Sequence, residues 1–141
     1  MPSTPKSSEP LRIRVVAGAI IRNGAVLVAQ RARSAEQAGL WELPGGKVQR
    51  GESDAMALVR ELQEELGITV AVTGLLGVSD HDYPAISIRL IGLCGHILSG
   101  EPQAREHSAI QWIGPDELKT LSWSPADVAL LEPLEVWLRS I

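Results

Sequence analysis

The chain has 141 residues and a formal net charge of −4, with 45% hydrophobic and 21% charged residues. This length fits one domain with one hydrophobic core, and the acidic balance disfavours a nucleic-acid coat protein, because binding to phosphate backbones normally needs a basic face. Cys94 is the only cysteine, which excludes an internal disulfide and favours a reducing, cytoplasmic location.

The first ten residues contain Pro and Ser but no apolar stretch. We therefore expect a disordered tail over 1–10, a single domain over 11–141, and no secretory signal of the usual form. Polar residues interrupt every apolar run before it reaches the roughly 20 residues of a membrane-spanning helix. The expected protein is soluble, has neither membrane nor nucleic-acid partners, and is a monomer or a homodimer.

Two β-branched apolar runs open the domain, at 12–21 and 25–30, with the turn signal Asn23-Gly24 between them. This pattern predicts an antiparallel hairpin. From Arg31 to Gly51 the periodicity disappears and Gly, Pro and charged residues accumulate, which predicts a long loop. Loops of this length are often functional.

A helix is predicted over 53–66, with Ser53 as its N-cap and Gly67 just beyond its end. Its apolar residues recur at helical spacing and predict one stripe facing the core. The residues of this stripe are Ala55, Leu58, Val59, Leu62 and Leu66.

Further strands are predicted over 68–79, 85–98 and 108–113, the first two on either side of the sequence HDYP. Pro115 starts a short helical turn through Lys119, and Pro125 starts a closing helix. The apolar residues of that closing helix are Val128, Leu131, Leu134 and Leu138. The sum is a mixed α/β domain.

Glu61, Glu64 and Glu65 fall within an arc about 100° wide on the central helix. Their like charges repel, and a bound cation would remove that penalty. Hard divalent ions such as Mg²⁺ prefer carboxylate oxygens. A Glu-rich helix face is also typical of a simple solvated surface, so the spacing by itself leaves both readings open.

The sequence before the helix favours the functional reading. Pro44-Gly45-Gly46 forms a Gly-rich turn, and Glu52 stands at the mouth of the helix. Glycine permits close approach of the backbone to a ligand. A loop carbonyl near Gly45 and the carboxylate of Glu52 can therefore join the helix acids around a metal.

Residues 46–68, GKVQRGESDAMALVRELQEELGI, resemble the Nudix box, G-x5-E-x7-R-E-U-x-E-E-x-G-U with U a bulky aliphatic residue, at every specified position. The segments VVAGAII, VLVAQR, WELPGGKV, SAIQW and SPADVALLEPL extend the resemblance to MutT-type members, particularly the branch that hydrolyses cytidine nucleotides. The resemblance implies the Nudix fold, a mixed β-sheet sandwiched between helices. It also implies a bound Mg²⁺, with Mn²⁺ as the alternative.

By this resemblance the metal ligands are Glu61, Glu64, Glu65 and the Gly45 carbonyl, and Glu52 supports the metal shell. Arg60 belongs to the catalytic group as the residue that orients the carboxylates. Glu61 is the expected general base, with Glu106 as the runner-up that holds metal or activates water. The alternative for Glu106 is a solvated loop residue.

On the substrate side, Arg31 matches the position of a phosphate-contacting arginine, with a surface arginine as the alternative. Asp127 matches the position where a guanine-selective MutT protein carries Asn. An ionised Asp only accepts hydrogen bonds, which favours the exocyclic amine of cytosine. A buried, protonated Asp127 would also admit 8-oxo-dGTP, and an exposed Asp127 would only complement a helix dipole.

Several residues are candidates for the walls of the substrate pocket. Leu43 replaces an aromatic found in some relatives, and Tyr83 and Trp41 are candidate walls that can equally serve in packing. Trp112, Trp123 and Trp137 are assigned to packing. His81, His96 and His107 have no metal-ligand spacing and are read as structural or solvent-facing.

The expected activity is Mg²⁺-dependent hydrolysis of nucleoside triphosphates to a monophosphate and pyrophosphate. The favoured substrates are CTP, dCTP and their 5-methyl forms, with 8-oxo-dGTP in a role in nucleotide pool sanitation and DNA repair. The alternatives are an 8-oxo-dGTP diphosphatase proper, an ADP-ribose pyrophosphatase and a catalytically silent nucleotide sensor. Pro84 favours the second, because it lies close to a position beyond the box where relatives that act on ADP-ribose often carry a proline.

Overall fold

The computed structural model describes residues 11–141, and the predicted tail over 1–10 lies outside the described residues. In chain order the elements are β1 (Arg12–Arg22), β2 (Ala25–Gln30), β3 (Trp41–Glu42), β4 (Gly45–Lys47), α1 (Asp54–Leu66), β5 (Thr69–Asp82), β6 (Ser87–Ser99), β7 (Ala109–Ile113), the 3-10 helix η1 (Pro115–Thr120), α2 (Pro125–Val128) and α3 (Leu131–Ser140). None of the helices described in 11–141 is long and apolar enough to cross a membrane.

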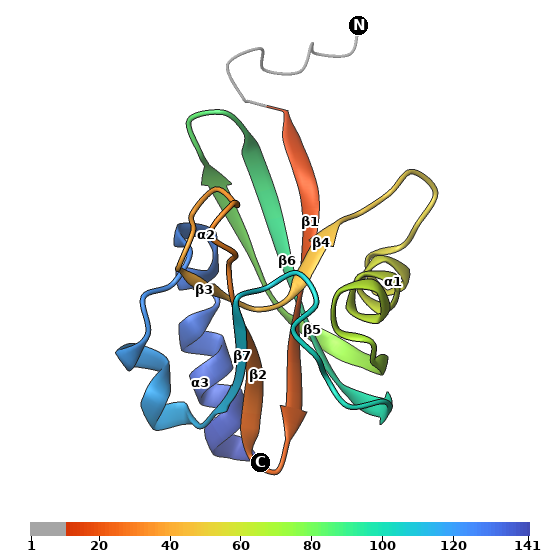
Figure 1. Cartoon of the computed structure of the whole chain (residues 1–141), viewed down its shortest axis with the longest axis vertical. Coiled ribbons are helices and arrows are strands. Elements are labelled where there is room, and N and C mark those ends of the chain that lie inside the picture. Colours follow the sequence, from red (N-terminus) through yellow and green to blue (C-terminus); the bar gives the residue numbers. More distant parts are fainter. Residues whose placement is uncertain (1–10) are drawn as a thin grey trace, which may run out of the picture.

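Strand β1 is the centre of a mixed sheet. It pairs in parallel with β6 from Arg12 to Ile20. It also pairs antiparallel with β4 from Val15 to Ala17 and with β2 at its C-terminal end. Strand β5 lies beyond β6, and β3 and β7 each pair with β2. Helix α1 covers one side of this sheet and α3 the other (Figure 1), which confirms the predicted mixed sheet between helices.

The alternation of side chains along β1 divides the core into two clusters. Val16 and Ile20 pack with the buried residues of α1, whereas Ala17 and Ala19 pack on the opposite face with those of α3. Between them, a Cβ added at Gly18 would lie 3.1 Å from a methyl carbon of Leu58. The missing side chain therefore lets α1 lie close against the central strand.

Helix α1 begins and ends as its sequence predicts. The Ser53 hydroxyl accepts a hydrogen bond from the Met56 N–H at 3.1 Å, and Gly67 ends the helix in the left-handed conformation with φ 71°. The predicted apolar stripe is wrong at one position, because Ala55 is exposed and Ala57 is fully buried instead. The rest of the stripe holds the helix to the sheet.

Two predictions about strands need correction. The predicted loop from Arg31 to Gly51 contains the short strands β3 and β4, which pair with β2 and β1. Strand β5 continues through Asp82, because a register of cross-strand pairs with β6 extends to Ser87. Strands β3 and β4 are too short to show a periodic apolar pattern in the sequence.

The predicted closing helix is interrupted between α2 and α3. The Leu130 N–H donates to the Asp127 carbonyl three residues back, at 2.9 Å, and this tighter turn buries the Leu130 side chain. Pro133 has no N–H and therefore fits the first turn of the new helix. Val128, predicted on the buried face, is consequently 53% exposed.

Candidate active site

Arg60, on α1, holds three carboxylates together. Its Nε and Nη2 donate to the two oxygens of Glu52 at 2.7 and 2.9 Å, and its Nη1 donates to Glu61 at 2.9 Å and to Glu64 at 3.3 Å. Nη2 also reaches the Lys47 carbonyl at 3.0 Å. The guanidinium thus ties the loop before α1 to the helix face, an arrangement that suits the predicted orienting role of Arg60.

Glu52 has both carboxylate oxygens engaged. Besides Arg60, its Oε1 accepts from the Gln49 N–H at 2.8 Å. These hydrogen bonds hold its pKa below the ordinary value, with the side chain of Arg60 as the largest cause. The geometry places Glu52 in support of the cluster.

Gly46 gives the Glu61 carboxylate its place. A Cβ added at Gly46 would overlap the carboxylate carbon of Glu61, and a Cβ at Gly45 would overlap the Val16 carbonyl oxygen. Only glycine therefore allows strand β4 to lie between β1 and the Glu61 side chain. The Gly-rich turn and the helix acids meet here, as the sequence predicts.

Glu61, Glu64 and Glu65 of α1, together with Glu106, form what we call the acidic group. Glu65 is its electrostatically least favourable member. Burial is the largest cause that raises its pKa to about 8, and the charges of Glu61, Glu106, Glu42 and Glu64 add to the effect. Its Oε2 atom is buried without a hydrogen-bond partner. A buried acceptor in this state costs free energy, which a cation would recover.

Glu106 reaches the same group from the loop before β7. Its side chain is exposed, yet its charge is the second largest of those that raise the pKa of Glu65. Glu106 therefore lies near enough to Glu65 for its charge to act on it, as the second candidate for the general base should.

A pocket of about 490 Å³ connects the acidic group to α2. Six of the predicted site residues line it, namely Arg31, Leu43, Gly45, Glu65, Tyr83 and Asp127. Its apolar wall includes Ile86, Ile88 and Leu90 from β6 and the turn before it. Trp41 does not line it and packs against the core cluster beside α3.

Asp127 lies at the inner wall of this pocket and is 5% exposed. Its Oδ2 accepts from the Leu43 N–H at 2.9 Å. Burial raises the pKa of Asp127 to about 8 despite the opposing effect of that hydrogen bond. Burial therefore favours the neutral, protonated form of Asp127, which was the alternative expected from the sequence, and the alternative of an exposed helix-terminal acid is wrong.

Tyr83 and Arg31 form two further walls. The Tyr83 hydroxyl accepts from the Ala126 N–H at 3.1 Å, which joins the β5–β6 turn to α2. Arg31 donates to the Glu36 carbonyl at 2.6 Å and to Glu42 at 2.8 Å. The guanidinium is thereby fixed at the pocket lining, where it can meet an anionic ligand.

Sequence reasoning missed two residues of this site. Glu42 lines the pocket and lies between Arg31 and His107. Its Oε1 accepts from Arg31, and its Oε2 lies 3.0 Å from the Nε2 atom of His107. His107, expected to be structural or solvent-facing, has a side chain only 6% exposed. The one signal for Glu42 is a lone charge between Trp41 and Leu43.

The acidic group fits a divalent cation by its donor chemistry. It offers hard carboxylate oxygens, among them the unpartnered Oε2 of Glu65. As they stand, however, no three His, Cys, Asp or Glu side chains within 11–141 converge closely enough to hold an ion, and Glu61 and Glu64 point to Arg60. The predicted ligand set is thus brought to one place without forming a finished cage.

We expect the stability of the wild-type protein to fall as pH rises from about 4 to about 8. Asp127 keeps its proton in the folded state up to about pH 8, while the unfolded chain releases it near the ordinary value of 3.8. The unfolded state therefore binds fewer protons in this window, and Asp127 contributes a decline in the free energy of unfolding of up to about 1.4 kcal/mol per pH unit.

Asp127→Asn should make this decline less steep, as measured by urea unfolding at several pH values, and the raised pKa of Glu65 should account for the decline that is left. The control is Asp80→Asn, because Arg89 lowers the pKa of Asp80 and its titration has the opposite sign. A decline of the same slope in Asp127→Asn would contradict the buried neutral acid.

Comparisons with known proteins agree with this geometry. The NUDIX domain family model matches residues 12–133. A Mycobacterium tuberculosis protein provisionally named 8-oxo-dGTP diphosphatase 2 is 50% identical over 117 residues, which cover 80% of this chain and 81% of that protein. The CTP pyrophosphohydrolase of Escherichia coli is 45% identical over 123 residues, covering 85% and 89% of the two chains. The solution structure of the E. coli ORF135 protein, 41% identical, superposes with a TM-score of 0.80 over 97% of this chain and 96% of that one.

Proposed function

The chain belongs to the Nudix family as a MutT-like nucleotide pyrophosphohydrolase, and from this premise we propose that it hydrolyses nucleoside triphosphates to a monophosphate and pyrophosphate. The observation that supports this is the continuity of the acidic group with the pocket: Glu65 lines one part of it and Asp127 another. A triphosphate chain and its nucleoside can therefore occupy adjoining parts of one site.

Glu61, Glu64, Glu65 and the Gly45 carbonyl are the proposed holders of Mg²⁺, or of Mn²⁺ in its place. When bound, such an ion neutralises phosphate oxygens and lowers the pKa of a bound water. Arg60 and Glu52 hold the carboxylates in position through their mutual hydrogen bonds. Glu61 takes the proton of the attacking water, with Glu106 as the second candidate for this base.

Arg31 is the proposed phosphate contact, because its guanidinium is already fixed at the pocket lining by Glu42 and Glu36. A planar guanidinium can donate two parallel hydrogen bonds to phosphate oxygens. Leu43, directly after β3, and Tyr83, in the β5–β6 turn, then enclose the nucleoside.

Asp127 is the proposed reader of the base. Because its pKa is about 8, the carboxyl group is mostly protonated at neutral pH and can donate one hydrogen bond while accepting another. Cytosine presents an acceptor, N3, beside its exocyclic amine donor, so its edge complements a neutral carboxylic acid. This supports CTP, dCTP and their 5-methyl forms as the favoured substrates.

The same observation supports 8-oxo-dGTP as the second candidate. The oxidised base carries an acceptor, O6, beside an N7–H donor, which is the same complementary order. A neutral Asp127 therefore admits both bases, and nucleotide pool sanitation stays the corresponding second role.

The base is tested by measuring pyrophosphate release from CTP, dCTP, 5-methyl-dCTP, dGTP, 8-oxo-dGTP and ADP-ribose with Mg²⁺. We expect the cytidine nucleotides to give the highest kcat/KM. Asp127→Leu, which removes the donor and the acceptor together, should lower the ratio of cytidine to guanine turnover by about tenfold or more. Asp80→Asn is the matched control and should leave the ratio unchanged.

Three results would point elsewhere. Dominant turnover of 8-oxo-dGTP would make the second candidate the function, and dominant turnover of ADP-ribose would remove the triphosphate assignment. A wild-type protein that binds these nucleotides without turning over any of them would identify a sensor.

A further inference from the structure

Glu106 belongs to the segment between β6 and β7, residues 100–108, which has no helix or strand of its own. Its backbone is tied down by two hydrogen bonds, from the Gln103 N–H to the Leu66 carbonyl and from the Ser108 N–H to the Gln30 carbonyl, each 3.0 Å long. From Glu101 to Ser108 every side chain is exposed except those of Pro102 and His107. The position of Glu106 therefore depends on a few specific anchors.

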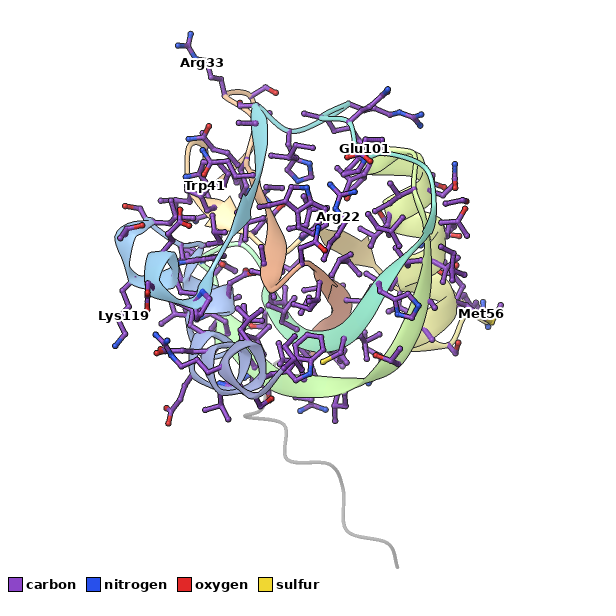
Figure 2. All side chains as sticks on the ribbon, turned by 90° about the horizontal axis from the view of Figure 1, so that it is seen from below. Arg22, Arg33, Trp41, Met56, Glu101 and Lys119 are labelled. Carbon is purple, nitrogen blue, oxygen red and sulfur yellow. The ribbon has the colours of Figure 1, made fainter. Side chains whose placement is uncertain are left out.

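One anchor holds the start of the segment. Both oxygens of Glu101 accept from Arg22 at 2.9 and 3.0 Å, and the Arg22 guanidinium lies 4.3 Å from the ring centre of Trp112. Figure 2 shows Arg22, at the end of β1, and Glu101, just after β6, pointing toward one another. This pair is exposed, so it contributes little to the precision of the segment.

A second anchor stands directly before Glu106. Arg105 donates to the Gln63 carbonyl at 3.3 Å, and its guanidinium covers Gly67, where a Cβ would come 2.5 Å from Nη2. The backbone preceding Glu106 is thus held against the C-terminal end of α1.

The third anchor, directly after Glu106, is His107. Its buried ring places Nε2 3.0 Å from Glu42, and the other oxygen of Glu42 lies 2.8 Å from Arg31. Because a carboxylate only accepts hydrogen bonds, Nε2 is the donor. The Nδ1 atom is buried without a hydrogen-bond partner, so the bond to Glu42 is the polar contact that fixes the ring.

We propose that His107 is a positioning residue, which sets the place of Glu106 by tying its loop through Glu42 to Arg31 at the pocket wall. The inference rests on the proposed hydrolase function and adds to it a link between the catalytic acids and the pocket. Arg31 and Glu42 line the pocket while Glu106 belongs to the acidic group, so this chain of hydrogen bonds joins the two halves of the site. Outer contacts of this kind typically change activity without touching the substrate.

The test compares His107→Leu with His107→Gln. A glutamine can present its amide N–H near the position of Nε2, whereas leucine fills the space without a donor. We expect kcat for CTP to fall about 10- to 100-fold in His107→Leu with KM changed less than about threefold, and His107→Gln to recover most of the loss. His96→Leu, at an exposed position of β6, is the matched control and should keep the wild-type kcat.

A second readout does not need turnover. Hydrogen exchange of the amides in 100–108 should accelerate about tenfold or more in His107→Leu, while α1 and β2 stay protected and His107→Gln resembles the wild type. Adding Glu106→Gln to His107→Leu should cost little further activity. The first change removes the carboxylate, and the second already leaves that carboxylate out of position.

Unchanged exchange in His107→Leu would overturn the proposal, and so would an unchanged kcat, or a glutamine variant no better than the leucine variant. An inactive wild type would overturn the proposed function instead, and the exchange measurement would still decide whether His107 positions the segment.

Discussion

Replacing Glu61 with glutamine should lower kcat for the favoured nucleotide by about a thousandfold, within the range seen for loss of a general base. The amide keeps the size of the carboxylate but removes its charge and its capacity to take a proton. Fold stability should change little, since Arg60 retains its two hydrogen bonds to Glu52. Steady-state kinetics of pyrophosphate release, together with a thermal melt of both proteins, measure this.

Glu132→Gln, on the exposed surface of α3, is the control for the loss of one carboxylate charge. It should retain the wild-type kcat. If Glu61→Gln kept kcat within about threefold of the wild type, Glu61 would be neither base nor metal ligand, and Glu106→Gln would be the next variant to assay.

Replacing Arg60 with glutamine should reduce kcat about 10- to 100-fold, through the carboxylates rather than through the substrate. In the wild type the cluster raises the pKa of Arg60, with the hydrogen bond to Glu52 as the main cause, so the cation is strongly held. Its loss leaves Glu52, Glu61 and Glu64 without their shared cation. The apparent affinity for Mg²⁺ should fall together with kcat, while KM for the nucleotide stays nearly constant.

The matched control is Arg14→Gln, which breaks an exposed ion pair with Asp54 outside the cluster. Exposed pairs contribute little, so its melting temperature and kcat should stay close to those of the wild type. An Arg60→Gln enzyme with increased KM and unchanged kcat would instead make Arg60 a substrate contact.

The elements with long, regular patterns could be predicted from the sequence. The hairpin at Asn23-Gly24 and helix α1 with its Ser53 cap are determined by local chemistry, and both are found where they were expected. Strands β3 and β4 could not be predicted, because two or three residues carry no periodicity and their pairing depends on strands distant in the sequence. The break before α3 depends on the burial of Leu130 in the core cluster beside α3, which is also a tertiary effect.

In the site, the sequence located the acids and the glycines but not their electrostatic state. Arg60 meets Glu64 at a spacing that a helical pattern gives directly, whereas its bonds to Glu52 and the Lys47 carbonyl depend on the path of the preceding loop. Asp127 was named from a resemblance, yet its burial, which raises its pKa, is a tertiary effect that its neighbours in the sequence do not indicate. The roles of these residues stay predictions until variants are assayed.

The most direct test of the central claim is to incubate the wild-type protein with CTP, with and without Mg²⁺, and to identify the products by phosphorus NMR. We predict CMP and pyrophosphate in equal amounts with the metal, and no reaction after chelation. Release of CDP and inorganic phosphate, or turnover that persists without the metal, would contradict it.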